Sequence, residues 1–178
     1  MTQELIIAGF GGQGVLRLGQ LIAYAGMVED KEVSWLPSYG PEMRGGTANC
    51  SVIVSDEPVG SPIVTSATSV MTLNGPATDK FESIVRPGGD MFVNSSLVER
   101  KIERDDINVY YIPANDIANS LGNGRILNMV MLGAFLKKSN CFSLETAEKA
   151  LKYVLGPSKE HLVPLNLKAM EEGAKCVE

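Results

Sequence analysis

Residues 4–28, ELIIAGFGGQGVLRLGQLIAYAGMV, predict a buried strand, a glycine turn and an amphipathic helix in direct succession. The apolar run 4–10 has the length of a buried strand and is closed by glycine. From Val15 to Val28, apolar residues recur at steps of three and four, which gives a helix one apolar face. The turn at 11–14 therefore joins a strand directly to a helix.

The rest of the chain continues to alternate strands with helices. A turn at 56–58 predicts a hairpin-like return through 59–64, and hence an antiparallel excursion near 47–64 in a mainly parallel sheet. The fold class predicted for residues 1–178 is a single α/β domain, layered and Rossmann-like. We expect further strands at 32–36, 47–55, 70–73, 90–94 and 108–112, and helices at 77–85, 115–121, 126–138, 143–155 and 164–177.

Bulk composition argues against several classes of protein. The 178 residues include 16 Lys and Arg against 21 Asp and Glu, a net charge of −5, and the basic residues do not cluster as in nucleic-acid-binding proteins. No apolar run approaches the ~20 residues that cross a bilayer. The N-terminal segment has no basic region of the kind that opens a signal peptide. We expect a cytoplasmic protein without nucleic-acid or membrane partners.

The cysteines and the histidine do not predict a metal site. Cys50, Cys141 and Cys176 lie far apart in the sequence and form no C-x-x-C pair. His161 is the single histidine, so a histidine-based site would lack further imidazole ligands. We expect these four side chains to be ordinary core or surface residues.

The glycine turn is the first candidate site. GFGGQG, residues 9–14, fits G-x-G-x-x-G between a strand and a helix, where backbone N–H groups can approach a phosphate. Dinucleotide binding also needs an acid at the end of the second strand, and that strand ends Trp35-Leu36-Pro37, which disfavours NAD or FAD. Alternatively, the glycines only allow close packing. Gln13 would be unusual in a packing turn, and its amide could bind a ligand or a facing protein.

A second glycine-rich stretch, LPSYGPEMRGG at 36–46, follows the second strand. We expect it at the carboxyl edge of the sheet, beside the glycine turn, where open α/β sheets bind ligands. Its prolines and glycines favour a stiff loop that presents Tyr39, Glu42 and Arg44 together. The guanidinium of Arg44 suits a carboxylate or phosphate, although an internal Glu42–Arg44 ion pair would also explain these residues.

Several motifs together resemble the gamma subunit, or gamma domain, of 2-oxoacid:ferredoxin oxidoreductases. They are GFGGQGV at 9–15, PSYGPEMRGGTANCSVIVSD at 37–56, PVGSPIV at 58–64 and LNMVMLGAF at 127–135, where Asn128 matches a polar position. The resemblance covers the whole chain in length and strand order, and is most specific over residues 9–64.

The resemblance implies a non-catalytic subunit of a multi-subunit enzyme. That enzyme decarboxylates a 2-oxoacid oxidatively, transfers the acyl group to coenzyme A and reduces ferredoxin. Thiamine diphosphate, Mg²⁺ and iron–sulfur clusters are expected on partner subunits, because this chain has neither a cysteine quartet nor a thiamine motif. We expect 2-oxoglutarate as the substrate, with pyruvate, branched 2-oxoacids and indolepyruvate left open.

The resemblance also implies residue roles. The isolated chain would be inactive and could form a homodimer, and segment 61–64 would share the partner-facing surface. A free-standing nucleotide-binding protein and a pure dimerisation module remain alternatives. The implied phosphate donors toward coenzyme A are Gly11, Gly12, Gln13 and Gly14, and the implied active-site rim is Ser38, Tyr39, Glu42 and Arg44.

Overall fold

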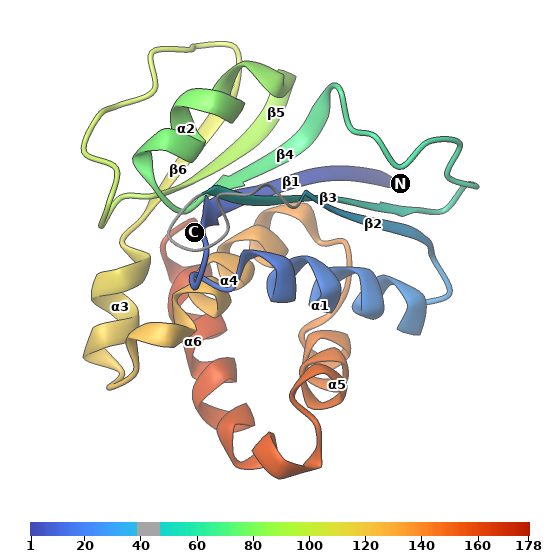
Figure 1. Ribbon diagram of the computed structural model, residues 1–178, viewed down its shortest axis with the longest axis vertical. Helices are drawn as coiled ribbons and strands as arrows, with labels where there is room; N and C mark the ends of the chain where they lie inside the picture. Colours follow the sequence, from blue (N-terminus) through green and yellow to red (C-terminus); the bar gives the residue numbers. More distant parts are fainter. Residues whose placement is uncertain (39–46) are drawn as a thin grey trace.

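A six-stranded mixed sheet organises the computed structural model, which describes residues 1–38 and 47–178 (Figure 1). The strands are β1 (Thr2–Phe10), β2 (Glu32–Ser38), β3 (Thr47–Ser55), β4 (Ala67–Thr72), β5 (Val85–Asn94) and β6 (Asn108–Ile112). The helices are α1 (Val15–Val28), α2 (Gly75–Phe81), α3 (Ala114–Ser120), α4 (Leu127–Ser139), α5 (Leu144–Leu155) and α6 (Val163–Lys175). Short 3₁₀ turns lie at Glu82–Ile84, Gly124–Ile126 and Pro157–Leu162.

The strand order is β2-β3-β1-β4-β5-β6, and only β3 runs against its neighbours. The pairs β1–β4, β4–β5 and β5–β6 are parallel. The predicted α/β fold class, with a mainly parallel sheet and an antiparallel excursion, is thus confirmed. The expected return through 59–64 is wrong, because residues 56–66 contain no strand. Pro58 and Pro62 in that segment cannot donate to a ladder.

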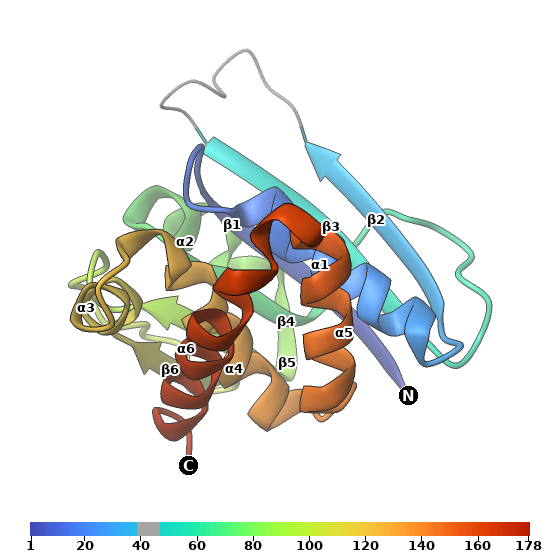
Figure 2. The same ribbon diagram turned by 90° about the horizontal axis from the view of Figure 1, so that it is seen from below.

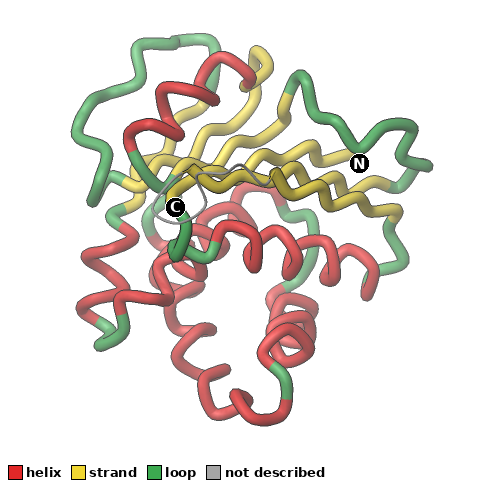
Figure 3. The backbone as a smooth tube through the Cα atoms, viewed as in Figure 1, coloured by secondary structure: helices red, strands yellow, loops and turns green. Residues whose placement is uncertain are grey.

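Successive strand residues point to opposite faces of the sheet, and each face has its own core. On β1, Leu5 and Ile7 belong to one buried cluster and Ile6 to the other. We call the side covered by α1, α3, α4, α5 and α6 the helix face, and the other side the α2 face. Figures 1 and 3 show α2 alone above the sheet and the other helices below it. Segments 56–66 and 95–107 complete the cover of the α2 face through Val64, Val98 and Ile107.

Two element boundaries differ instructively from the sequence prediction. The helix expected at 77–85 ends at Phe81. The strand expected at 90–94 begins earlier, at Val85, and runs through Pro87-Gly88-Gly89, a composition typical of a helix stop. Gly88 has a φ of 79°, and its N–H donates to the Asp106 carbonyl (2.7 Å). A positive φ at glycine lets the strand bend and continue where another residue would be strained.

The helix face is held together by a close crossing of α4 and α6. A Cβ on Gly133 would lie 1.9 Å from the Met170 carbonyl oxygen, and one on Gly173 would lie 1.8 Å from that of Val130. Both positions therefore require glycine, because each helix backbone touches the other. α5 begins after Ser143, whose hydroxyl caps the helix by accepting from the Thr146 N–H (3.1 Å).

Candidate functional site

The glycine turn joins β1 to α1 through backbone conformations that favour glycine. Gly12 and Gly14 have φ angles of 93° and 78°. A Cβ on Gly14 would also lie 2.4 Å from Asn128 Nδ2, which itself donates to the Gly14 carbonyl (3.3 Å). Gly14 is thus required both by its own conformation and by an amide from α4. Asn128, singled out as a polar residue in an apolar helix, lies directly against the turn.

The Gln13 amide is engaged within the chain. Its Oε1 accepts from the Phe10 N–H (2.6 Å), and its Nε2 donates to the Leu73 carbonyl (3.3 Å). The Gln13 N–H donates to the Phe10 carbonyl (3.2 Å). In this structure the Gln13 side chain therefore braces the turn, whereas Gly11, Gly12 and Gly14 line the adjoining pocket.

The N-terminus of α1 is electropositive. No side chain caps it, and its first turn contains no acidic residue. The N–H groups of the first turn of a helix have no intrahelical partners, and the helix dipole places partial positive charge there. This end of α1 therefore favours an anion.

A pocket of about 520 Å³ opens beside the turn. Three cationic residues from separate segments line it: Arg17 on α1, Arg125 before α4 and Lys159 after α5. None of the described residues that line it is acidic. The arrangement suits an anionic group at the mouth and a less polar portion deeper in the pocket. The deeper wall is apolar and includes Val15, Leu21, Met129, Leu151, Val154, Leu155 and Leu162.

The second candidate region lies at the same edge of the sheet as the glycine turn. Along β3, Thr47 pairs with Phe10 of β1 and Asn49 pairs with Ser38 of β2. Figure 2 shows the ends of β1 and β2 on one side, with β3 between them. Ser38 is exposed there, whereas the expected rim residues Tyr39, Glu42 and Arg44 lie outside the described residues.

The segment 61–64 does not share that edge. It follows the end of β3, where Ser55 pairs with Thr2, so it lies toward the opposite end of β1 from the glycine turn. The expectation that 61–64 belongs to the same surface is therefore wrong. The cause is the reversed direction of β3, which carries the chain away from the turn.

The cysteines do not form a ligand cluster. Cys50 and Cys141 are buried, and burial raises the pKa of the Cys50 thiol to about 12 and that of Cys141 to about 11. Cys176 is exposed near the C-terminus. Over residues 1–38 and 47–178, no group of three or more His, Cys, Asp or Glu could hold a metal ion. The described residues therefore do not fit an iron–sulfur cluster.

The pocket includes functional candidates that sequence reasoning missed. Arg125 and Lys159 belong to separate short 3₁₀ turns, and Arg17 follows the glycine motif on the helix. Asn166, buried on α6, also lines the pocket. No local pattern marks these residues, because only the packing of α4, α5 and α6 against α1 brings them together. Among the described residues, no helix is long and apolar enough to cross a membrane.

Comparison with known proteins gives consistent matches. The family model "Pyruvate ferredoxin/flavodoxin oxidoreductase" matches residues 4–176. The chain is 37% identical over 169 residues to the ketoisovalerate oxidoreductase subunit VorA of Methanothermobacter marburgensis, covering 94% of this chain and 35% of that protein. The chain thus spans about a third of the length of that curated relative.

Two solved structures share the fold closely. One is the gamma subunit of a keto/oxoacid ferredoxin oxidoreductase from Geobacter sulfurreducens, with a TM-score of 0.86, 30% identity and coverage of 99% of this chain and 97% of that one. The other is a 2-oxoglutarate:ferredoxin oxidoreductase from Magnetococcus marinus, with a TM-score of 0.89, 25% identity and coverage of 99% and 31%. Since the family model matches nearly every residue, the chain belongs to the pyruvate ferredoxin/flavodoxin oxidoreductase family.

Proposed function

We propose that residues 1–178 act as a single gamma-type domain, the gamma subunit of a 2-oxoacid:ferredoxin oxidoreductase. The enzyme would be cytoplasmic and would carry thiamine diphosphate, Mg²⁺ and iron–sulfur clusters on partner subunits, with ferredoxin as electron acceptor. The near-complete overlap with the Geobacter sulfurreducens gamma subunit supports this role, because that chain has nearly the same extent. The isolated chain would be inactive and could pair with a second copy.

The pocket at the α1 N-terminus is the main observation that supports a role in binding coenzyme A. Coenzyme A has several phosphate charges on an elongated body. The pocket offers three cationic residues, several apolar side chains and the α1 N-terminus, which has no side-chain cap. The similar Magnetococcus marinus structure has coenzyme A and succinyl-CoA bound. We therefore assign the phosphate-bearing part of coenzyme A to this pocket, with the backbone of Gly11, Gly12 and Gly14 contributing donors.

The active-site rim remains part of the proposal. Ser38, Tyr39, Glu42 and Arg44 would face the thiamine-binding subunit, and Ser38 lies at the same sheet edge as the pocket. A rim at that edge would lie beside the coenzyme A pocket of the same subunit. A loop that is stiff before docking loses less conformational freedom in the complex.

The binding role is tested by removing pocket cations in the assembled complex. Arg125→Ala and Lys159→Ala should each raise the KM for coenzyme A about 3- to 10-fold, because partly screened charge pairs contribute modestly. The matched control is Lys149→Ala, which removes a cation that pairs with Glu145 on α5 outside the pocket lining (3.0 Å). The Lys149 variant should leave the KM unchanged. Equal KM values in the wild type and the three variants would overturn the coenzyme A assignment.

The substrate and the alternative role need different measurements. We propose 2-oxoglutarate as the substrate. The similar Magnetococcus marinus enzyme is a 2-oxoglutarate:ferredoxin oxidoreductase, whereas the Methanothermobacter marburgensis relative is a ketoisovalerate oxidoreductase subunit. Turnover of the native complex with each 2-oxoacid separates these substrates. A free-standing nucleotide-binding protein would instead purify alone and bind NAD or FAD. Co-purification with thiamine-binding and cluster-binding subunits, without such binding, supports the gamma-subunit role.

A further inference from the structure

Buried amide side chains tie the glycine turn to two neighbouring strand ends. Gln13 Oε1 accepts from the Phe10 N–H, and Asn74 Nδ2 also lies within hydrogen-bonding distance of that oxygen (3.4 Å). Gln13 Nε2 donates to the carbonyl of Leu73, which follows β4 (3.3 Å). Asn94, the last residue of β5, donates to the same Leu73 carbonyl through Nδ2 (3.1 Å). The chain of contacts therefore runs from β1 through β4 to β5.

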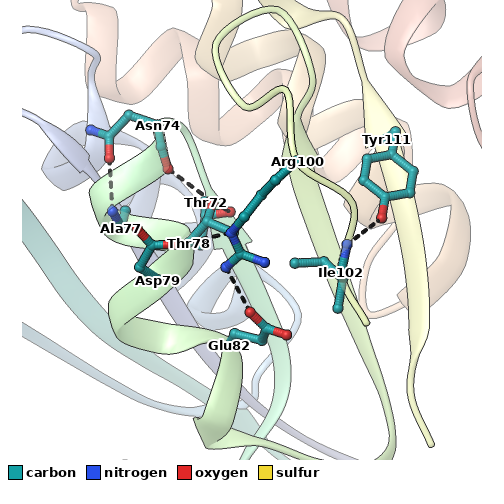
Figure 4. Close-up of polar contacts among 9 residues, drawn as sticks. All are labelled: Thr72, Asn74, Ala77, Thr78, Asp79, Glu82, Arg100, Ile102 and Tyr111. Carbon is teal, nitrogen blue, oxygen red and sulfur yellow. Dashed lines mark hydrogen bonds and ion pairs between the residues drawn. The ribbon is translucent and has the colours of Figure 1, made fainter. Parts of the chain in front are cut away.

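Backbone groups fix the orientation of each amide. Asn74 Oδ1 accepts from the Ala77 N–H at the start of α2 (2.8 Å; Figure 4), so its Nδ2 must be the atom that faces Gln13. Asn94 Oδ1 accepts from the Ala114 N–H at the start of α3 (3.2 Å), so its Nδ2 faces Leu73 and Asn115 Oδ1 (2.7 Å). A flipped amide would set acceptor against acceptor or donor against donor. The network has one self-consistent arrangement.

The burial of these amides implies a specific positional role. Asn74 is 1% exposed and Asn94 is fully buried, and each uses its Oδ1 for a backbone N–H while its Nδ2 donates toward the turn or the Leu73 carbonyl. Buried polar groups are costly unless every hydrogen bond is made, and a satisfied network restricts the chain to one geometry. Here the restricted geometry includes the backbone at Phe10, where the glycine turn begins.

We propose that Asn74 and Asn94 are positioning residues that act through Gln13 to hold the glycine turn in its coenzyme A-binding shape. This inference rests on the coenzyme A assignment made above. Asn74 and Asn94 are absent from the lining of the pocket, so they influence it only through the turn. Their contribution concerns the direction of the turn N–H groups and the position of the α1 N-terminus.

The sharpest variant is Asn74→Asp in the assembled complex. Aspartate is as good a helix cap as asparagine, so α2 keeps its acceptor for the Ala77 N–H. The Asn74 donor that faces Gln13 Oε1 becomes an acceptor, and the contact becomes repulsive. The KM for coenzyme A should rise about 10-fold. This is the effect of losing one well-oriented hydrogen bond from a displaced turn N–H to a charged phosphate of coenzyme A. The kcat should stay within about 2-fold, because ground-state and transition-state binding weaken together.

The matched control is Thr78→Val on the same helix. The Thr78 hydroxyl is buried and lies 2.8 Å from both Thr72 Oγ1 and the Asn74 carbonyl oxygen (Figure 4). Its hydrogen bonds therefore lie within the start of α2 and the end of β4, away from the Gln13 amide. Its loss should lower Tm by several degrees while leaving the KM unchanged. The comparison thus separates a defect in positioning from a defect in stability.

The outcomes distinguish the two proposals. A raised KM in Asn74→Asp, with a normal KM in Thr78→Val, supports the positioning role. A normal KM in Asn74→Asp, while Arg125→Ala raises it, overturns the positioning role and leaves the coenzyme A assignment intact. Equal KM increases in both α2 variants assign the effect to stability and also overturn the positioning role. Unchanged KM values in Asn74→Asp and Arg125→Ala overturn the coenzyme A assignment and the inference with it.

Discussion

The two faces of the sheet are stabilised by different means. On the helix face, the buried cluster is continuous from the strands into α1, α4 and α6, and includes aromatic side chains such as Phe92 and Phe135 in edge-to-face contact (centroids 5.9 Å apart). The α2 face has a smaller cluster, covered by one short helix and two segments without regular structure. Apolar burial therefore contributes more to the helix face.

Polar bridges supplement the smaller apolar cluster on the α2 face. Arg104 donates through Nη1 to the carbonyls of Glu82 and Val85 (2.8 Å each) and pairs with Asp106 through Nη2 (2.7 Å). Arg100 pairs with Asp79 and Glu82, which fastens segment 95–107 to α2 (2.9 and 2.7 Å; Figure 4). The difference indicates that stability resides mainly on the helix face, where packed helices also form the walls of the pocket.

Removing one phenyl ring from each face should give the largest difference in stability between the two faces. Phe135 is fully buried on α4, so Phe135→Ala should lower the free energy of unfolding by about 4 kcal/mol. Phe81 is only partly buried under the α2 face, so Phe81→Ala should cost about 1–2 kcal/mol. Urea unfolding followed by circular dichroism measures both. Equal losses would mean that the two faces contribute alike.

Local patterns predicted the first strand, the glycine turn and α1, because each depends on residues near one another in the chain. The insertion of β3 between β1 and β2 was harder to predict, since the pairing of Phe10 with Thr47 is non-local. The start of β5 was missed because Pro87-Gly88-Gly89 has the composition of a stop. Among the site residues, the glycines were recognisable. Arg125 and Lys159 were not, since tertiary packing alone brings them to the turn.

A methyl group added to glycine should have opposite effects on the two faces. In Gly133→Ala, the new Cβ would collide with the Met170 backbone, which should force α4 and α6 apart and cost about 3 kcal/mol. Gly60→Ala, in segment 56–66 of the α2 face, is the matched control, because a Cβ there meets no atom within 4 Å, its φ lies outside the left-handed region, and alanine restricts the unfolded chain. Thermal unfolding should show a lower Tm for the first variant only. A Gly133→Ala protein as stable as the wild type would contradict the close helix crossing.

The smallest predicted effect is the pH dependence of stability that Asp106 gives to the α2 face. The Arg104 guanidinium lowers the pKa of Asp106 from its ordinary value. A carboxyl with a lowered folded-state pKa contributes stability that is present above its unfolded pKa of about 3.9, and that is lost as the pH falls through the folded value. Asp106→Asn should therefore lower the urea midpoint slightly at pH 7, and this deficit should shrink as the pH falls below 4.

The matched carboxyl on the other side is Glu172 of α6. Its pKa is lowered by Lys175, three residues along the same helix. The Arg104 that pairs with Asp106 differs because it also donates to the carbonyls of Glu82 and Val85. Glu172→Gln should therefore change the urea midpoint less than Asp106→Asn does at pH 7, because neighbouring charges on an exposed helix surface stabilise weakly. If both variants shift the midpoint equally, the Arg104–Asp106 bridge behaves as an ordinary surface pair. The polar fastening of segment 95–107 would then depend on the two carbonyl contacts of Arg104 and on the ion pairs of Arg100.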